Sequence, residues 1–526
     1  MGAETEYGVH APAKPHANPT VLSAFVVNTY DTLFKEKLTS ELNSTWEYSS
    51  ETPLTDARGF TVTREKAHPS QLTDTAQILT SEDIAAEALS EAGHFAERID
   101  WDAVTMNSIL PNGARLYVDH AHPEYSSPEV TNPRHAVLWD AAGDHIAAQS
   151  VATIERMVQG EQSAMPAVNL YKNNTDGKGQ SYGSHENYLL PRSVDFEYLT
   201  AALLPFFATR QIMVGAGRVG LGTAAERAGF QISQRADFFE RTVGLETTVR
   251  RPLVNTRDEP HAESSKYRRL HVITGDANLS HYSNLLKFGT MSLVLNLVEA
   301  QQVPAIKLAD PVQAMHAVSH DLSLKQPLAL ASGGEMTALE IQDAYLQAAR
   351  NLEANPDPET QEILDLWADT LQALEHDLLS LADRLDWVAK YALMSSYIAK
   401  GHTWADPKLA AIDLQYSDVR TTKGLYHKLV ALGRMKTLFT PQEIARAAHE
   451  PPRDTRAYLR GKFITTWPDE VLGANWDTLS ARNPLSIDLH RLHMDDPTGF
   501  TAETVEPHLG LAHADQLFAL LNKTEH

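Results

Sequence analysis

Hydrophobic and polar residues alternate in two stretches of the N-terminal quarter of the chain, and this period of two predicts β-strands. The first stretch runs from Ala3 to Val9 and places Glu4 and Glu6 on one face. The second covers residues 114–119 and follows a turn that is expected at Gly113. Because alternate side chains of a strand share a face, each stretch presents its polar groups to one side of a sheet.

Three short runs further along the chain also look like strands. They are RQIMV (210–214), HVITG (271–275) and MKTLFT (435–440). Pro123 and Pro128 are expected to end regular strand pairing, because proline lacks the backbone N–H that a ladder of hydrogen bonds uses.

A spacing of three or four residues between apolar positions predicts helices elsewhere. This spacing is clear in residues 283–300 and dominates residues 334–402. Within the second segment, Pro356 and Pro358 mark a break between two helices.

The order of these elements suggests how the chain is organised. Residues 64–101 read as an insertion, a polar loop followed by one amphipathic helix that begins at Ser81. A new helix is expected after Thr440. We therefore expect a large domain over residues 1–440 and a small α/β domain over residues 441–526.

Composition narrows the classes of protein. The chain has 526 residues, of which 43% are hydrophobic, so it can bury a sizeable core. Its 68 acidic and 45 basic residues give a net charge of −23, and we therefore expect neither nucleic acid nor a membrane as partner. Since there is no cysteine, disulfides, thiolate metal sites and a cysteine nucleophile are excluded. With no basic leader and no apolar run of about 20 residues, we expect a soluble, cytoplasmic protein.

Carboxylates on the two N-terminal strands form a candidate metal site. If both strands face one cleft, Glu4, Glu6 and Asp119 converge there with Glu124, which follows a His-Pro turn. Like charges packed so closely cannot all stay ionised without a cation, and carboxylate oxygens suit Mg²⁺. The alternative is that Glu4 and Glu6 lie on the solvated side of an edge strand.

Other polar groups leave two interpretations open. The segment YKNNTDGKGQSYGSHENYL (171–189) is predicted to form a loop. In one interpretation His185, Glu186 and Asn187 contact a metal or the substrate, and in the other this is an ordinary surface loop. Arg235 and Arg257 could grip a carboxylate or phosphate through the guanidinium fork, or form structural salt bridges.

Known phosphate and hydrolase motifs are missing. Gly215, Gly217 and Gly220 spell G-x-G-x-x-G, but the later glycines at 222 and 229 leave too little room for the helix that a dinucleotide motif needs. The chain also has no P-loop, no H-E-x-x-H and no G-x-S-x-G. If the protein uses ATP without a P-loop, it must bind the phosphates through a metal ion and arginines.

Six motifs in order resemble one family, and together they span residues 1 to about 480. They are MGAETEYG, NGARLYVDHAHPEYSSPE, YKNNTDGKGQSYGSHENYL, NTRDEPH, YRRLHVITGDANLS and DLQYSDVR. This pattern is similar to the depupylases, also called deamidases of Pup. Such enzymes hydrolyse the bond between substrate lysines and the side chain of the C-terminal glutamate of Pup, a small, mostly disordered bacterial modifier. They also deamidate a Pup that ends in glutamine.

The resemblance implies an α+β, glutamine-synthetase-like fold. Its large domain would hold a curved antiparallel β-sheet cradle packed on helices, beside a small C-terminal domain. The alternative within the same family is the Pup ligase, which forms the bond with consumption of ATP. The sequences of the segments ANPTVLS and HAHPEYSSPE, and the long insertion before Asn112, favour the depupylase.

The resemblance also implies roles for individual residues. Mg²⁺ would be bound by Glu4, Glu6, Tyr117, Glu124 and His185. ATP would be bound by Arg115, Ser126, Arg460 and Trp476. The terminal glutamate of Pup would be bound by Arg235, Arg257 and His271. Asp119 would be the catalytic carboxylate, as a nucleophile or as a general base, and ATP a bound cofactor. The expected partners are Pup and pupylated proteins, and the enzyme is expected to be a monomer.

Overall fold

The computed structural model describes residues 1–38, 45–47, 51–67, 106–160, 166–482 and 488–524. The helix that is predicted to begin at Ser81 lies outside these residues, as does most of the insertion 64–101. None of the helices in the described ranges combines the length and the apolarity that a membrane span requires.

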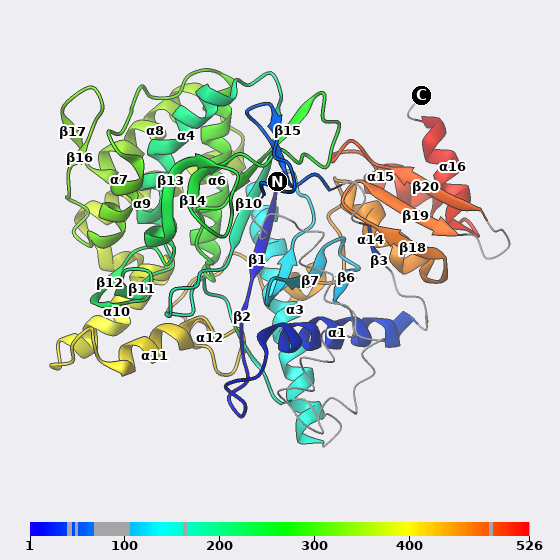
Figure 1. The fold of residues 1–526 in the computed structure, drawn as a ribbon, viewed down its shortest axis with the longest axis horizontal. Helices are drawn as coiled ribbons and strands as arrows, with labels where there is room; N and C mark the ends of the chain where they lie inside the picture. Colours follow the sequence, from blue (N-terminus) through cyan, green and yellow to red (C-terminus); the bar gives the residue numbers. More distant parts are fainter. Residues whose placement is uncertain (39–44, 48–50, 68–105, 161–165, 483–487, 525–526) are drawn as a thin grey trace.

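A six-stranded antiparallel sheet forms the centre of the molecule (Figure 1), with the strand order β15-β10-β1-β8-β7-β6. Its strands are β1 (Gly2–Glu6), β6 (Asn107–Ile109), β7 (Arg115–Asp119), β8 (His122–Ser126), β10 (Ser184–Pro191) and β15 (Tyr267–Val272). Both predicted N-terminal strands are therefore present, and they lie on either side of β8. We call the sheet face that carries Glu4 and Glu6 the cradle face.

Pro123 does not end strand pairing, contrary to the prediction. It lies inside β8 and pairs with Val118 of β7. The pairing of β8 with β1 stops at Glu124, so the missing N–H of Pro123 falls just beyond the last paired residue. Its carbonyl still accepts a hydrogen bond from the Tyr7 N–H at 2.9 Å. Proline is tolerated there because the ladder needs only its acceptor.

Two helices pack on the strands of the central sheet, α1 (Pro19–Leu38) on β7 and β8 and α3 (Pro133–Gln159) on β1. The other helices of the large body pack mainly on one another and on the smaller sheets. They are α4 (Phe196–Thr209), α5 (Gln211–Val214), α6 (His281–Glu299), α7 (Pro311–His320), α8 (Ala338–Leu352), α9 (Pro358–His376), α10 (Asp386–Ile398), α11 (Pro407–Tyr416), α12 (Leu425–Ala431) and α13 (Pro441–Ala447). The helices predicted in 283–300 and 334–402 are confirmed. α6 is buried on nearly all sides, as its continuous apolar sequence requires, and Ser280 caps its N-terminus.

Two of the three predicted apolar strands are wrong. Most of RQIMV forms the short helix α5, because three apolar residues in a row do not distinguish a strand from a buried helical turn. MKTLFT is an irregular connection. HVITG contributes only His271 and Val272 to β15.

The G-x-G-x-x-G segment forms a β-hairpin, not the start of a helix. Its strands are β11 (Arg218–Leu221) and β12 (Arg227–Gln231). Further short strands are β2 (Gly8–His10), β4 (Thr55–Asp56), β5 (Phe60–Thr61), β9 (Asn169–Tyr171), β13 (Phe239–Gly244), β14 (Arg251–Asn255), β16 (Leu328–Ala329) and β17 (Glu335–Met336).

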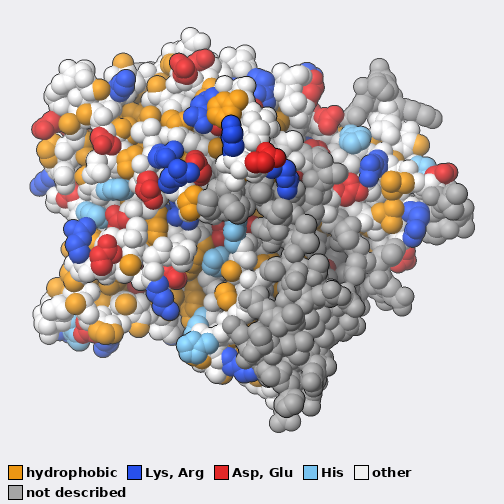
Figure 2. All heavy atoms as spheres, viewed as in Figure 1, with side chains coloured by type: hydrophobic (Ala, Val, Ile, Leu, Met, Phe, Trp, Pro, Cys, Tyr) orange, Lys and Arg blue, Asp and Glu red, His pale blue; other side chains and the backbone are white. Residues whose placement is uncertain are grey.

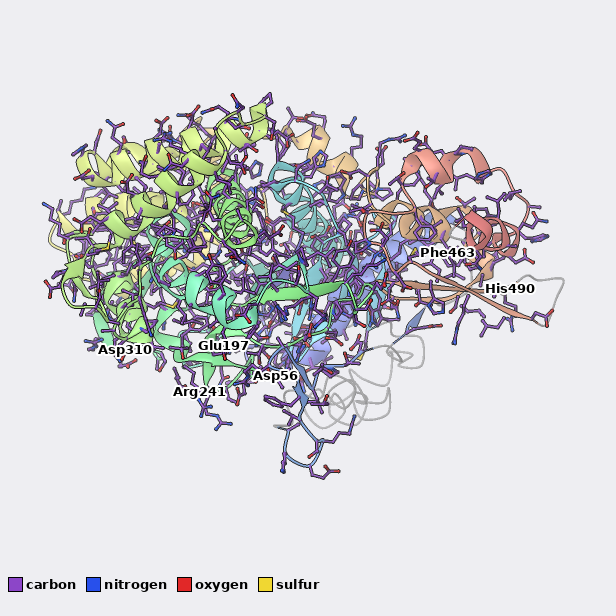
Figure 3. All side chains as sticks on the ribbon, turned by 90° about the horizontal axis from the view of Figure 1, so that it is seen from above. Asp56, Glu197, Arg241, Asp310, Phe463 and His490 are labelled. Carbon is purple, nitrogen blue, oxygen red and sulfur yellow. The ribbon has the colours of Figure 1, made fainter. Side chains whose placement is uncertain are left out.

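A second group of elements packs around its own core, to the right of the large body in Figure 1. This C-terminal group contains α14 (Ala457–Thr466), β18 (Val471–Ala474), β19 (Thr478–Arg482), β20 (Leu489–His493), α15 (Ala502–Val505), α16 (Ala514–Thr524) and one strand from far upstream, β3 (Thr45–Trp46). In Figure 3, Phe463 lies inside this group and His490 lies along its outer strand.

The division of the chain at residue 440 stays a prediction. Thr440 does cap a new helix, α13, with a capping box. α13 packs against α3, however, and Ala447 and Ala448 belong to the core of the large body.

Candidate active site

The register of the central sheet places the candidate residues in two rows across the cradle face. Glu4 pairs with Ser126 on one side and with His185 on the other, and Ser126 pairs in turn with Arg115. The next row contains Tyr117, Glu124 and Glu6, which are paired in that order. Four strands thus bring the predicted metal ligands and two of the predicted nucleotide contacts to one surface.

The two edges of the cradle carry the remaining groups. Asn187 of β10 pairs with His271 of β15, so both lie beside Glu4. Asp119 ends β7, next to the hairpin turn that leads into β8. One oxygen each of Asp119, Glu6 and Glu124 lie within 4.8 Å of one another. The predicted convergence is therefore confirmed for three of the four carboxylates, whereas Glu4 groups with His185 and His271 instead.

Residues 184–191 form a strand, although the polar segment around them was predicted as a loop. On this strand His185 and Asn187 face the cradle, while Glu186 points into the opposite layer. There Glu186 receives two hydrogen bonds from the guanidinium of Arg210, at 2.6 and 3.1 Å. Glu186 is therefore excluded as a metal or substrate contact.

Histidines stabilise the charge of Glu4. Its carboxylate lies 3.1 Å from Nδ1 of His185 and 3.5 Å from Nε2 of His271, and the amide of Asn187 donates to it at 2.9 Å. Burial opposes ionisation, but the two histidines outweigh it and hold the pKa of Glu4 well below its usual range. Burial itself lowers the pKa of His271 to about 3. His271 is therefore neutral at physiological pH, and its contact with the glutamate of Pup stays a prediction.

Glu6 and Glu124 differ although they are neighbours. Burial disfavours the charged form of Glu6, but His122, 3.3 Å away, brings its pKa down to about 2. The pKa of Glu124 is raised well above its usual range by burial and by the charges of Asp119, Glu4 and Glu6. A divalent cation between these groups would remove that repulsion, so the donor set fits Mg²⁺.

The crowding of Glu124 leads to a prediction about stability. When folding raises the pKa of a carboxyl group, the folded state loses stability as the pH increases from the pKa of the group in the unfolded chain to its pKa in the folded protein. We therefore expect Glu124→Gln to raise the melting temperature of the metal-free protein at pH 7.5. The same variant should lose most of the stabilisation that millimolar Mg²⁺ gives the wild type, about 2.7 kcal/mol at a hundredfold excess over Kd.

Differential scanning fluorimetry with and without EDTA measures both effects. Glu197→Gln, on the outer surface (Figure 3), serves as the control and should change neither. A metal-free Glu124→Gln protein that melts at a lower temperature than the wild type would contradict the expected repulsion between Glu124 and the neighbouring carboxylates.

The carboxylate of Asp119 is the most accessible of the cluster, with its side chain 26% exposed. Its Oδ2 lies 2.9 Å from Nδ1 of His120, a residue in the hairpin turn with a φ of +53°. The hydrogen bond and the charge of Asp119 raise the pKa of His120 to about 9. At neutral pH, a protonated imidazole therefore orients this carboxylate.

The two predicted substrate arginines, Arg235 and Arg257, form no salt bridge with any acidic residue that the structure describes. Arg235 is fully buried, and its donors reach the carbonyls of Ile273 and Gly275 and the hydroxyl of Ser181. Burial and the nearby Arg251 lower its pKa to about 9. The buried Nε of Arg257 makes no hydrogen bond within the described ranges. A bound anion would satisfy the free donor of Arg257, whereas Nε and Nη1 of Arg235 already have partners in the protein.

The nucleotide contacts predicted at Arg460 and Trp476 occupy different depths. Arg460 is fully buried, pairs with Glu129, and donates to the carbonyls of Gly113 and Trp476. It supports Trp476 from behind, with its guanidinium 4.9 Å from the indole, and a direct contact with nucleotide stays a prediction.

A cavity of about 520 Å³ connects the cradle with the C-terminal group. Glu4, Asn187 and Arg269 border it on the cradle side, and Arg456 and Trp476 on the other. Its walls are apolar, aromatic, basic and acidic, the last from Glu4, Glu129 and Glu299, so that a nucleoside phosphate would need a cation beside Glu4. In Figure 2, acidic and basic side chains are interspersed over the large body, despite the acidic total.

Sequence reasoning missed three residues of this site, whereas Asn187 had been named as a candidate contact. His120 had a signal, since it adjoins Asp119. Arg269 likewise alternates with His271 on β15 and lies 3.7 Å from Glu4. Trp46, which contacts Arg115, had no signal, because it lies in a stretch without periodicity.

Comparison with known proteins is consistent across nearly the whole chain. Residues 1–480 match the family described as Pup-ligase protein. A depupylase of Acidothermus cellulolyticus is 46% identical over 504 residues, which cover 94% of this chain and 93% of that protein. A Pup deamidase/depupylase of Mycolicibacterium smegmatis is 44% identical, with coverage of 91% and 90%. A Pup–protein ligase of Xylanimonas cellulosilytica is 40% identical, with coverage of 78% and 90%.

Solved structures show the same fold. The Pup ligase PafA in complex with Pup matches with a TM-score of 0.75 at 30% identity, over 99% of this chain and 94% of that one. PafA in complex with ADP matches with a TM-score of 0.71 at 34% identity, over 85% and 95%. The predicted α+β, glutamine-synthetase-like fold is therefore confirmed. The chain belongs to the Pup-ligase protein family and, within it, to the branch of the depupylases and Pup deamidases.

Proposed function

We propose that this protein is a depupylase, which hydrolyses the isopeptide bond between the side chain of the C-terminal glutamate of Pup and a substrate lysine. It would also deamidate a Pup that ends in glutamine. The observation that carries the proposal is the accessible carboxylate of Asp119, oriented by a protonated His120 at the edge of a carboxylate cluster. The depupylase names of the relatives with 43–46% identity support it.

An amide is a poor electrophile, so its hydrolysis needs an activated nucleophile and stabilisation of the developing oxyanion. The carboxylate of Asp119 attacks the amide carbonyl, the C–N bond breaks as the lysine amine leaves with a proton taken from water, and a second water hydrolyses the anhydride. In the alternative, Asp119 takes a proton from a water that attacks the carbonyl and passes this proton to the leaving amine. In either role the carboxylate must be held in position, and the contact with Nδ1 of His120 at 2.9 Å does so. Arg235 and Arg257 would hold the carboxylate of the terminal glutamate and align the bond with Asp119.

The donor sets fit Mg²⁺ and ATP as cofactors. Glu4, Glu6 and Glu124, with His185 and Tyr117, would hold the metal, and Arg115, Ser126 and Trp476 the nucleotide. Burial and Glu124 keep the pKa of Tyr117 well above its usual range, so Tyr117 offers a neutral phenol. When bound, Mg²⁺ would neutralise the clustered carboxylates and polarise the substrate carbonyl. The complex of PafA with ADP supports nucleotide binding in this family.

A gel assay with nucleotide analysis tests the proposal. Purified protein, Mg²⁺ and ATP are mixed with a pupylated substrate, and free Pup, ATP and ADP are followed together. We expect Pup to be released while ATP stays largely intact. Attachment of Pup to the substrate with one ADP per bond would make the protein a ligase, the alternative function in this family.

The remaining partners and the location extend the proposal. Pupylated proteins would reach Asp119 from the exposed hairpin side of the cradle, since His120 is exposed there. Cytoplasmic location and a monomeric state stay predictions, which fractionation and light scattering can check.

A further inference from the structure

Trp46 occupies an unexpected position between the cradle and the C-terminal group. It belongs to β3, more than four hundred residues upstream of the strand with which it pairs, and only 6% of it is exposed. The guanidinium carbon of Arg115 lies 4.0 Å from the centre of a Trp46 ring and 3.8 Å from that of Tyr117. A cation held between two aromatic faces is strongly restricted in orientation.

Several backbone and side-chain bonds fix the indole itself. β3 pairs in parallel with β18, where Ala474 is the partner of Trp46. The N–H of Glu47 donates to the Ala474 carbonyl at 3.1 Å, and Ser480 donates to the Glu47 carboxylate at 2.6 Å. The indole N–H of Trp46 donates to Glu51 at 3.1 Å. Trp46 is therefore held at its backbone and at the edge of its ring.

The same indole also supports the second aromatic group of the site. Trp46 and Trp476 meet edge to face, with ring centres 5.2 Å apart and planes at 73°. Trp476 borders the cavity, but Trp46 does not. Trp46 thus touches Arg115 and Trp476, two residues that are predicted to bind the nucleotide, on the side away from the cavity. Trp46 itself cannot stack on a base in the cavity from this position.

We propose that Trp46 is a positioning residue of the nucleotide site, which holds Arg115 and Trp476 in the geometry that binds a nucleoside phosphate. This inference rests on the proposed function, since it assumes that nucleotide binds beside these two residues. Its physical basis is preorganisation: a guanidinium already ordered by two rings loses less conformational entropy when it binds an anion.

Titration calorimetry of the full-length protein with Mg·ATP tests the inference. Trp46→Leu should weaken the affinity by about tenfold to thirtyfold, the factor for loss of a desolvated cation–π contact. Trp46→Phe should retain affinity within about threefold, because it keeps an aromatic face. Trp46→Met fills the space without that face and replaces Trp46→Leu if the leucine variant does not fold.

A matched control separates positioning from general damage to the C-terminal group. Trp467 is an equally buried indole of the same core, away from Arg115, whose N–H donates to the carbonyl of Leu511. Trp467→Leu should lower the melting temperature as Trp46→Leu does, yet leave Mg·ATP affinity within about twofold. Equal losses of affinity in both variants would overturn the inference.

A double-mutant cycle identifies the route of the effect. Arg115→Met alone should weaken Mg·ATP binding, and adding Trp46→Leu should weaken it by no more than about threefold further, since the guanidinium is already gone. A positioning role would be contradicted if the two substitutions together weakened affinity by the product of their separate factors. A folded Trp46→Leu protein with wild-type affinity would also contradict it. If the wild type binds no Mg·ATP, the proposed cofactor site fails, and this inference fails with it.

Discussion

Asp119→Asn is expected to reduce the release of Pup by about three to four orders of magnitude while the protein stays folded. Asparagine has nearly the shape of aspartate, but its amide is neither a nucleophile nor a base. It cannot replace a group that must carry negative charge next to the protonated His120. Single-turnover rates on a fluorescently labelled pupylated substrate, read from gels, measure the loss.

The control for this variant is another aspartate-to-asparagine exchange away from the cradle. Asp310 caps α7 on the outer surface of the large body (Figure 3), and asparagine caps helices equally well. Asp310→Asn should therefore release Pup at the wild-type rate. An Asp119→Asn protein with more than a tenth of wild-type activity would rule out Asp119 as the catalytic carboxylate.

Arg210→Met is expected to lower the free energy of unfolding by about 3–5 kcal/mol, because it leaves the carboxylate of Glu186 buried without a countercharge. Both side chains are almost fully buried behind the cradle strand β10. Arg210 also donates to Thr274, and the hydroxyl of Tyr188 donates to Glu186 at 2.8 Å. Urea denaturation followed by tryptophan fluorescence measures the loss.

Two further variants make this result specific. Arg134→Met removes the exposed ion pair with Glu362 and should cost at most about 1 kcal/mol. Replacing both members of the buried pair, as Glu186→Leu with Arg210→Met, should recover much of the loss, since no charge is then left unpaired. Equal losses for Arg134→Met and Arg210→Met would show that burial of the pair is unimportant.

Most of the candidate site could be predicted because strands have a fixed period. Alternation alone put Glu4 with Glu6 and Tyr117 with Asp119 on shared faces, and the antiparallel register then aligned Glu6 with Glu124. The roles of Arg235, Arg257 and His271 came instead from family resemblance. No local pattern indicates that their distant segments meet at one cluster.

The errors have equally specific causes. RQIMV was too short to distinguish a helical turn from a strand, and the polar residues around His185 concealed a strand because half of them face a buried polar layer. The contacts of Arg460 could not be predicted, since its partner Glu129 lies more than three hundred residues away. Pairings over such separations are set by tertiary packing, not by local sequence.

The origin of β3 has a consequence for how the protein is made. The sheet of the C-terminal group takes its edge strand from residues 45–46, which leave the ribosome long before β18, at residues 471–474, exists. The early segment must therefore wait for its partner through synthesis of most of the chain. A C-terminal fragment made alone would expose the edge of β18, and unpaired edges promote association between chains. Assembly of this region should thus be among the last events of folding, because closure of so long a loop is slow.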